Sequence, residues 1–433
     1  MKKLCVASLI GLSVTSAWGM DLLEVYQEAL ANDAQYASAR AQAEAGRESA
    51  VQARAGLLPS IGASANTTYN QNTFSGQDRN YNSNGYGAQL TQPVFRWQNW
   101  VQYQQGQLQV GITEAQLANA RQDLALRVAQ AYFEVLKAAD VLEAVNTLKK
   151  AASEQLALSK KSFEVGTVTI TDVHEAQSRF DLANAQQLAA ANALEVRRQS
   201  LTQLIGRPAG VLAPLRSGVS IAAPSPADID SWVGAAEDNA YGVQVQQLAA
   251  EIAARDVERN RAAHLPTVDL VARYNKSSTG FSSTTGSAAD STTRSIGLEV
   301  AVPLFAGGAL SSRDRESAAL KLRADADLEA ARRAAALAAR QAYLGVTSGM
   351  AQISALEAAQ VSSNSALEAN RLGYEVGVRI NIDVLNAQSQ LSDAEQQLAA
   401  ARYDTLVAQL QLEASAGQLD EADIQRVNAL LSH

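Results

Sequence analysis

An internal duplication constrains the fold of this chain more than any single motif does. Short motifs in one half return in the same order in the other half, shifted by 207 to 211 residues. The matching segments are 58–60 with 265–267, 92–95 with 302–305, 130–132 with 341–343, 164–166 with 375–377, and 172–178 with 383–389. Because the offset between matching segments changes so little along the chain, we infer a tandem repeat with roughly 200 residues in each half.

Each half contains one predicted β-hairpin. Residues 22–57 are rich in Ala and Glu and predict a helix, which Pro59 ends because a proline pushes the preceding residue out of the helical region. Apolar and polar residues then alternate over about 60–95, and again over about 266–305. The alternation predicts two hairpins, each with an apolar face and a more polar face.

A very long helix follows each hairpin. Residues 99–164 and 312–375 contain no proline, and their apolar positions follow a heptad in which alanine is frequent. At about 1.5 Å per residue each stretch would span roughly 100 Å. Gly166 and Gly377 end these helices, and return helices begin near Thr171 and Asn381. The sequence therefore predicts helical hairpins that pack closely side by side.

The first nineteen residues are typical of a secretory signal peptide. Lys2 and Lys3 precede an apolar stretch over 4–14, and small residues stand before a cleavage site in front of Met20. The only cysteine is Cys5, so the mature chain would contain none and would not be acylated through cysteine. The predicted organisation is 1–19 signal peptide, 20–205 first repeat (helical hairpin about 99–205), 206–231 proline-rich linker, 232–416 second repeat (helical hairpin about 312–416) and 417–433 C-terminal segment.

Composition argues against several classes of function. The net charge is −8, which disfavours nucleic acid as a partner. The three histidines lie far apart and there is one cysteine, so we expect no metal site, no cofactor and no catalytic residue. Any energy for transport must then come from a partner.

Two hairpins give four strands, which cannot close into a barrel with an apolar exterior. Open strand edges are costly in lipid, so we expect the chain to oligomerise. Two chains would give eight strands and three would give twelve, and strand number alone does not choose between them. Two rival interpretations remain open at this point: an exported coiled-coil structural or scaffold protein without a channel, and an exported enzyme.

The repeated order and the two helical turns resemble the TolC family of outer-membrane channel-tunnels. The turns read Glu-Val-Gly-Thr at 164–167 leading to Ile-Thr-Asp-Val at 170–173, and Tyr-Glu-Val-Gly-Val-Arg at 374–379 leading to Ile-Asp-Val-Leu at 382–385. The resemblance implies a mainly α homotrimer with a transmembrane twelve-stranded β-barrel, continued by an α-helical coiled-coil tunnel in the periplasm. It also implies an outer-membrane exit duct for drug efflux or type I protein secretion. The implied partners are a periplasmic adaptor (membrane fusion) protein, an inner-membrane transporter (ABC or proton-driven) and outer-membrane lipid.

The resemblance also implies roles for residues at the turns. Asp383 matches an acid that forms a ring at the closed entrance, where three carboxylates would attract cations and raise one another's proton affinity. The second ring position is Asn386, so we expect one acid ring instead of two. Tyr374 and Arg379 match residues that hold the second hairpin against the first.

The expected partners of Tyr374 and Arg379 are Thr171 and Asp172, and the set would act as a gate latch. Exposed valines beside each turn glycine favour contact with another protein's helical hairpin. The expected adaptor-contact residues are Val165, Gly166 and Thr167 in the first turn and Val376, Gly377 and Val378 in the second.

Overall fold

The computed structural model describes residues 19–74, 77–216, 218–281 and 287–432. All but the last residue of the predicted signal peptide lies outside the described residues. Within these ranges, no helix combines the length and the apolar character needed to cross a membrane. The chain forms two compact units, and each unit takes segments from both halves of the sequence.

We name the two units by their content. The helical unit comprises the described parts of Met1–Ala37, Arg121–Ala235 and Leu337–His433. The sheet unit comprises the described parts of Ser38–Ala120 and Ala236–Ala336.

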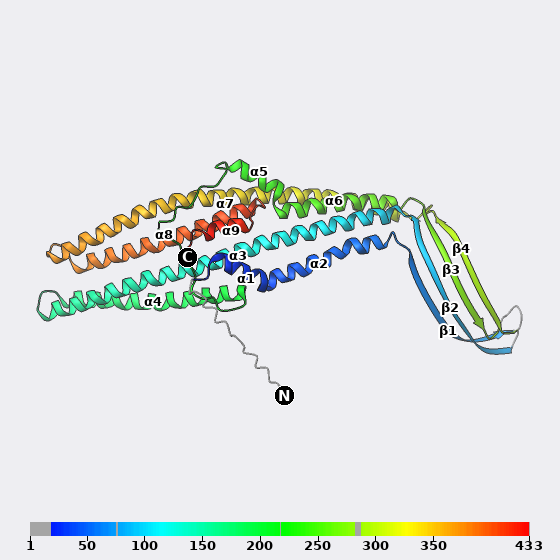
Figure 1. Cartoon of the computed structure of the whole chain (residues 1–433), viewed down its shortest axis with the longest axis horizontal. Helices are drawn as coiled ribbons and strands as arrows, with labels where there is room; N and C mark the ends of the chain where they lie inside the picture. The colour runs from blue at the N-terminus through cyan, green and yellow to red at the C-terminus, as the bar shows by residue number, and fades with distance from the viewer. Residues whose placement is uncertain (1–18, 75–76, 217, 282–286, 433) are drawn as a thin grey trace, which may run out of the picture. The chain divides into compact units, whose positions relative to one another are not determined.

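The sheet unit contains one antiparallel sheet of four strands in the order β1-β2-β3-β4 (Figure 1). The strands are β1 Ser60–Phe74, β2 Gln77–Phe95, β3 Thr267–Thr279 and β4 Ala289–Ala301. The predicted hairpins are therefore present, and pairing of β2 with β3 joins the two repeats. β4 ends at Ala301, before the predicted end near 305, because Pro303 has no N–H to donate to a ladder.

The register places apolar residues on one face of the sheet and polar residues on the other. One cross-strand row consists of Ile61, Leu90, Ala272 and Ile296, and the adjacent row of Gly62, Gln89, Arg273 and Ser295. Neighbouring rows point to opposite faces, as predicted. The apolar row is largely exposed at its two ends, Ile61 and Ile296.

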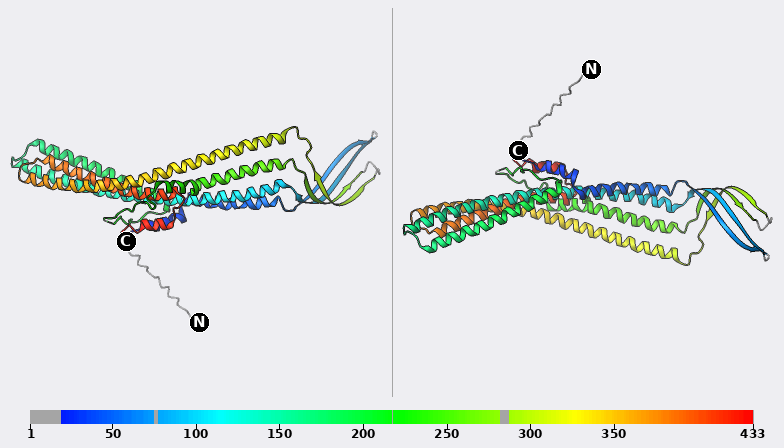
Figure 2. Two further views of the ribbon diagram at one scale, coloured as in Figure 1. Left: turned by 90° about the horizontal axis from the view of Figure 1, so that it is seen from above. Right: turned by 90° about the horizontal axis from the view of Figure 1, so that it is seen from below.

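Nine helices lie in the described ranges, and the long predicted helices are confirmed. They are α1 Leu22–Asn32, α2 Ala34–Ala55, α3 Trp97–Glu164, α4 Ile170–Ile205, α5 Ile229–Asn239, α6 Tyr241–Ala262, α7 Ala309–Glu375, α8 Asn381–Ser415 and α9 Glu421–Asn428. Figure 1 and Figure 2 together show that, within the helical unit, α3 runs beside α4 and α7 beside α8.

The predicted helix over 22–57 is two helices, because Asp33 interrupts it. The Asp33 carboxylate accepts the backbone N–H of Tyr36 at 2.7 Å and so caps α2. Arg127 donates to both carboxylate oxygens, at 3.1 and 3.2 Å. Burial opposes ionisation of Asp33, but these hydrogen bonds prevail and lower its pKa.

The main core of the helical unit surrounds Tyr132 and Phe133 of α3, with Leu201 of α4 and Leu406 of α8 fully buried beside them. Close helix contact depends on small residues. A Cβ built on Gly349 of α7 would lie 2.3 Å from the Thr405 hydroxyl of α8, so the two helices meet at a separation that only glycine permits.

Segments near both ends of the described chain dock on the same linker. Met20 forms a bridge with Leu212, and Leu215 forms one with Leu431. The Asn428 side chain of α9 accepts the N–H of Leu23, 405 residues away, at 3.2 Å. The first and last helices therefore pack together in the helical unit.

Candidate entrance site at the two helical turns

The two turns that connect α3 to α4 and α7 to α8 lie in the helical unit, and each has a left-handed glycine. Gly166 has φ 78° and Gly377 has φ 79°, a conformation that strains residues with a Cβ. The N–H of Thr167 donates to Ser162 O at 2.9 Å, and that of Val378 donates to Gly373 O at 2.9 Å. Both long helices thus end by the same glycine-based motif, as the spacing predicted.

The turns expose apolar side chains. Val165, Val376 and Val378 are 74%, 65% and 77% exposed. Exposed valines beside a turn glycine leave apolar side chains open to solvent at each tip, which favours contact with another protein.

Asp172 serves the start of α4. Thr169 and Asp172 form a reciprocal capping box, in which Asp172 accepts the Thr169 N–H and hydroxyl, both at 2.8 Å. Thr171, one residue earlier, is exposed in the first turn. The cap of α4 is therefore Thr169, two residues before the predicted helix start.

Arg379 lies beside Asp383 in the same turn. Its guanidinium is 3.7 Å from the Asp383 carboxylate, a pairing between residues four apart. The aliphatic stem of Arg379 covers Gly373, where an added Cβ would lie 2.6 Å from Arg379 Cγ. Within one protomer, Arg379 is thus placed beside Asp383, whereas Asp172 is bonded to Thr169.

Tyr374 is half-buried and packs against a small apolar cluster at the same end of the unit. The cluster consists of Leu367, Val384, Ala387 and Leu391. Packing of Tyr374 on this cluster holds the ring between α7 and the first turns of α8.

Asn386 contacts a basic residue that the sequence did not single out. Arg179 of α4 donates to Asn386 Oδ1 at 3.0 Å, so the contact joins α4 to α8. The two residues are 207 positions apart and share no motif, so nothing in the sequence pairs them. The positive charge of Arg179 therefore lies next to Asn386, the second ring position, where this chain has an amide in place of an acid.

A groove lies between α3, α4 and α8 above these contacts. It has a volume of about 530 Å³, and its floor is apolar, including Val145, Leu182 and Ala190. Arg179 and Asp393 supply its charged groups. The groove can accommodate apolar side chains and one ion pair.

A partly buried acid links α8 to α9. Glu413 accepts from Arg426, which is also 2.9 Å from Asp423. One guanidinium is thus shared by two carboxylates. Burial of Glu413, together with the nearby charge of Asp423, raises the pKa of Glu413 to about 7.

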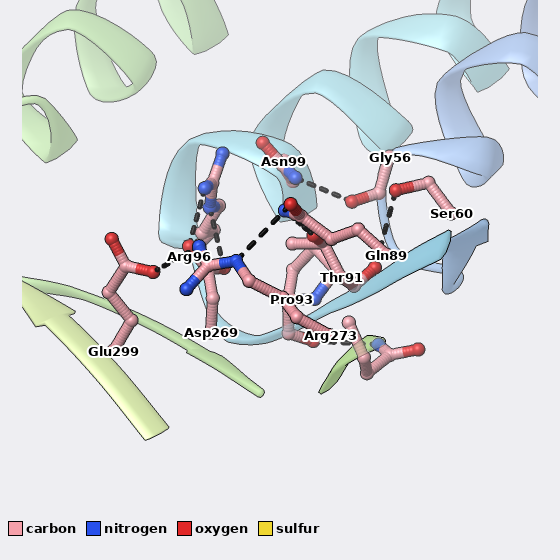
Figure 3. A network of polar contacts seen from close by, with 11 residues as sticks. Gly56, Ser60, Gln89, Thr91, Pro93, Arg96, Asn99, Asp269, Arg273 and Glu299 are labelled. Carbon is pink, nitrogen blue, oxygen red and sulfur yellow. Dashed lines mark hydrogen bonds and ion pairs between the residues drawn. The ribbon is translucent and has the colours of Figure 1, made fainter. Parts of the chain in front are cut away.

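A second polar cluster lies in the sheet unit, where β2 meets α3 (Figure 3). Arg96 donates to both oxygens of Asp269, at 2.9 and 2.5 Å. Arg273 contacts Gln89 at 3.2 Å and Glu299 at 3.4 Å on the same face. This network fixes the beginning of α3 to the polar face of the sheet.

Known proteins resemble this chain over nearly its whole length. The sequence profile of the family described as outer membrane efflux protein matches residues 25–207 and 232–418. Outer membrane protein TolC of Vibrio cholerae is 33% identical, with 99% of this chain and 98% of the relative covered. Alkaline protease secretion protein AprF of Pseudomonas aeruginosa is also 33% identical, with 95% and 88% covered.

Solved structures share the fold. The outer membrane protein VceC of Vibrio cholerae has a TM-score of 0.78 at 20% identity, covering 92% of this chain and 96% of that one. The CmeC outer membrane channel of Campylobacter jejuni has a TM-score of 0.78 at 18% identity, covering 95% and 90%.

Proposed function

Because this chain belongs to the outer membrane efflux protein family, we propose that it forms a passive, gated trimeric duct in the outer membrane. The duct exports cargo that an inner-membrane transporter delivers, and it carries out no catalysis. The observation that carries the proposal is the sheet of the sheet unit, which exposes an apolar face and has β1 and β4 as its outer strands.

Assembly follows from the cost of strand edges in lipid. In the hydrocarbon of the bilayer, each unpaired backbone N–H or C=O costs several kcal/mol, because it lacks the hydrogen bond that it would make elsewhere. Three copies would pair β4 of one protomer with β1 of the next and close a ring of twelve strands, wide enough for an aqueous lumen. The exposed Ile61, Ile296 and Leu298 would then face lipid, with the exposed Tyr69 and Tyr86 near the level of the headgroups.

The turns of the helical unit form the periplasmic entrance in this proposal. Asp383 contributes the ring of three carboxylates, partly neutralised by Arg379, and the neutral Asn386 follows it beside Arg179. The ring therefore binds cations, though more weakly than two uncompensated acid rings would.

The latch joins the second turn to the first between or within protomers. Arg379 and Tyr374 are its donors, and Asp172 with Thr171 is the acceptor region. In the closed state Arg379 would contact Asp172, and on opening it would exchange Asp172 for Asp383, beside which it lies within one protomer. Replacing Tyr374 by Phe together with Arg379 by Ser should raise single-channel conductance, since both donors are lost in three copies.

The apolar tips and the nearby groove would bind a periplasmic adaptor. Val165, Gly166 and Thr167 form one contact, and Val376, Gly377 and Val378 form the other. A helical hairpin of the adaptor would place its own apolar residues against these valines. The relatives include a protease secretion protein and outer-membrane efflux channels, so both ABC and proton-driven transporters are compatible with the duct.

Planar-bilayer recordings test the proposal directly. Purified protein should migrate as a heat-modifiable trimer and should give discrete, small-conductance channels. A coiled-coil scaffold or an exported enzyme would give neither membrane conductance nor a trimer that resists detergent.

A further inference from the structure

A buried polar pair joins the two helical hairpins next to the α7–α8 turn. Asn381, the first residue of α8, is 7% exposed, and Ser159 near the end of α3 is 1% exposed. Asn381 Nδ2 donates to Ser159 Oγ at 2.9 Å across 222 residues of sequence. The contact lies two residues from Asp383 and belongs to neither the predicted ring nor the predicted latch.

Packing alone does not explain this pair. Val384, one turn further along α8, is buried in an apolar cluster, so this end of α8 buries apolar residues as well as Asn381. Asn381 Oδ1 is also buried and accepts no hydrogen bond from the described residues. An amide that is only half satisfied costs stability, and an apolar pair would avoid that cost.

The duplication provides an internal comparison. At the offset of 211 residues, Ser159 corresponds to Asn370 and Asn381 corresponds to Ile170. Asn370 donates to Ala366 O in its own helix at 3.0 Å, and Ile170 is about half exposed. The buried pair is therefore not a feature that both repeats inherited, and it ties the second turn to the first hairpin at one place in each protomer.

We propose that Ser159 and Asn381 are positioning residues of the entrance gate, a buried catch that holds the start of α8 against α3 when the entrance is closed. This inference rests on the proposed channel function. When the α7–α8 hairpin moves away from α3, both side chains become hydrated, so the bond that is lost is replaced by bonds to water. The catch therefore holds the closed state without preventing opening.

The catch differs physically from the ion pair of the same turn. Arg379 and Asp383 are partly exposed, so salt screens their attraction. The Ser159–Asn381 bond joins two neutral, buried groups and is insensitive to salt. Variants of the catch should therefore change gating by the same factor at low and at high ionic strength.

Bilayer recordings of four purified trimers test the proposal: Asn381→Ala, Ser159→Ala, the double variant, and Asn370→Ala as the matched control. One neutral hydrogen bond corresponds to roughly a fivefold change in the ratio of open to closed states, and three copies multiply this to about a hundredfold. Each single variant should raise that ratio by a similar factor at about 0.1 M and 1 M salt. The double variant should add little to either single variant, and the control should behave as wild type.

Several outcomes would overturn the inference. Single variants that conduct like wild type, or a double variant whose effect is the product of the two singles, would show that the residues do not act as a pair. Wild-type protein that forms no channel would refute the proposed function instead. If the alanine variants fail to give heat-modifiable trimers, a disulfide variant tests instead whether holding α8 against α3 keeps the entrance closed.

The disulfide variant carries Ser159→Cys and Asn381→Cys in a chain whose only native cysteine is Cys5 in the predicted signal peptide. Added to the Tyr374→Phe, Arg379→Ser background, the oxidised pair should keep conductance low until a reductant is supplied. Equal conductance before and after reduction, with the cross-link confirmed on a gel, would contradict the catch.

Discussion

Replacing Arg96 should destabilise the sheet unit more than replacing its partner Asp269 does. The Asp269 side chain is 11% exposed, whereas the Arg96 side chain is 41% exposed. Glu299 stands opposite Asp269 in the register of β3 and β4, so the two acids are cross-strand neighbours. Arg96→Met leaves a buried carboxylate beside another acid, while Asp269→Ala leaves an arginine that can turn into water.

The magnitudes follow from these exposures. Removing one partner of a buried ion pair costs about 3–5 kcal/mol, and the exposure of Arg96 favours the lower end, about 3 kcal/mol. In Asp269→Ala the unpaired guanidinium can be solvated, as in a surface ion pair, so we expect the free energy of unfolding to fall by about 1 kcal/mol. At roughly 2–4 °C per kcal/mol, Arg96→Met should lower the Tm by about 6–12 °C and Asp269→Ala by about 2–4 °C.

Thermal unfolding in detergent measures the difference, with Trp97 and Trp100 as fluorescent reporters beside the pair. An Arg96→Met, Asp269→Leu variant should recover most of the lost Tm, because an apolar pair leaves no buried charge. Equal losses in the two single variants, or a double variant as unstable as Arg96→Met, would refute this reasoning.

Three further changes test other features. The pKa of Glu413 is about 7 in the folded chain against 4.5 for a free carboxyl group, so the folded chain binds this proton more tightly than the unfolded chain does. The stabilisation that this proton gives is complete below about pH 4.5 and is lost as the pH rises through 7. Glu413→Gln should therefore flatten the fall in Tm between pH 5 and pH 8. Gly349→Ala should lower the Tm by several degrees, because its Cβ would overlap Thr405. Asp383→Ala should leave the trimer intact and weaken block by divalent or trivalent cations in bilayer recordings.

The strands and long helices could be predicted because local signals mark them. Proline ends helices before the hairpins, and left-handed Gly166 and Gly377 end the two longest helices. The break at Asp33 was not predicted, because its stability depends partly on Arg127, 94 residues away. A sequence of good helix formers gives no local sign of that partner.

The contacts between hairpins could not be predicted for a related reason. Heptad periodicity shows which face of a helix is apolar, but it does not fix the axial register between two helices. A shift of one turn would separate Arg179 from Asn386, and likewise Asn381 from Ser159. Such pairs were therefore visible only once the helices were placed side by side.

The contact between α1 and α9 imposes an order on folding. Leu22 and Val25 of α1 are buried in the core that also contains Ile424 and Val427 of α9. Asn428 bonds to Leu23 and Asp21 across 405 and 407 residues, so this closure has one of the largest possible contact separations and is entropically slow. During synthesis and export from the N-terminus, α1 can pack on α4 early, but the part of its apolar face that meets α9 stays uncovered until α9 has followed. A chain that stops before residue 421 would keep that face open to proteases, so completion of this contact distinguishes full-length chains from truncated ones.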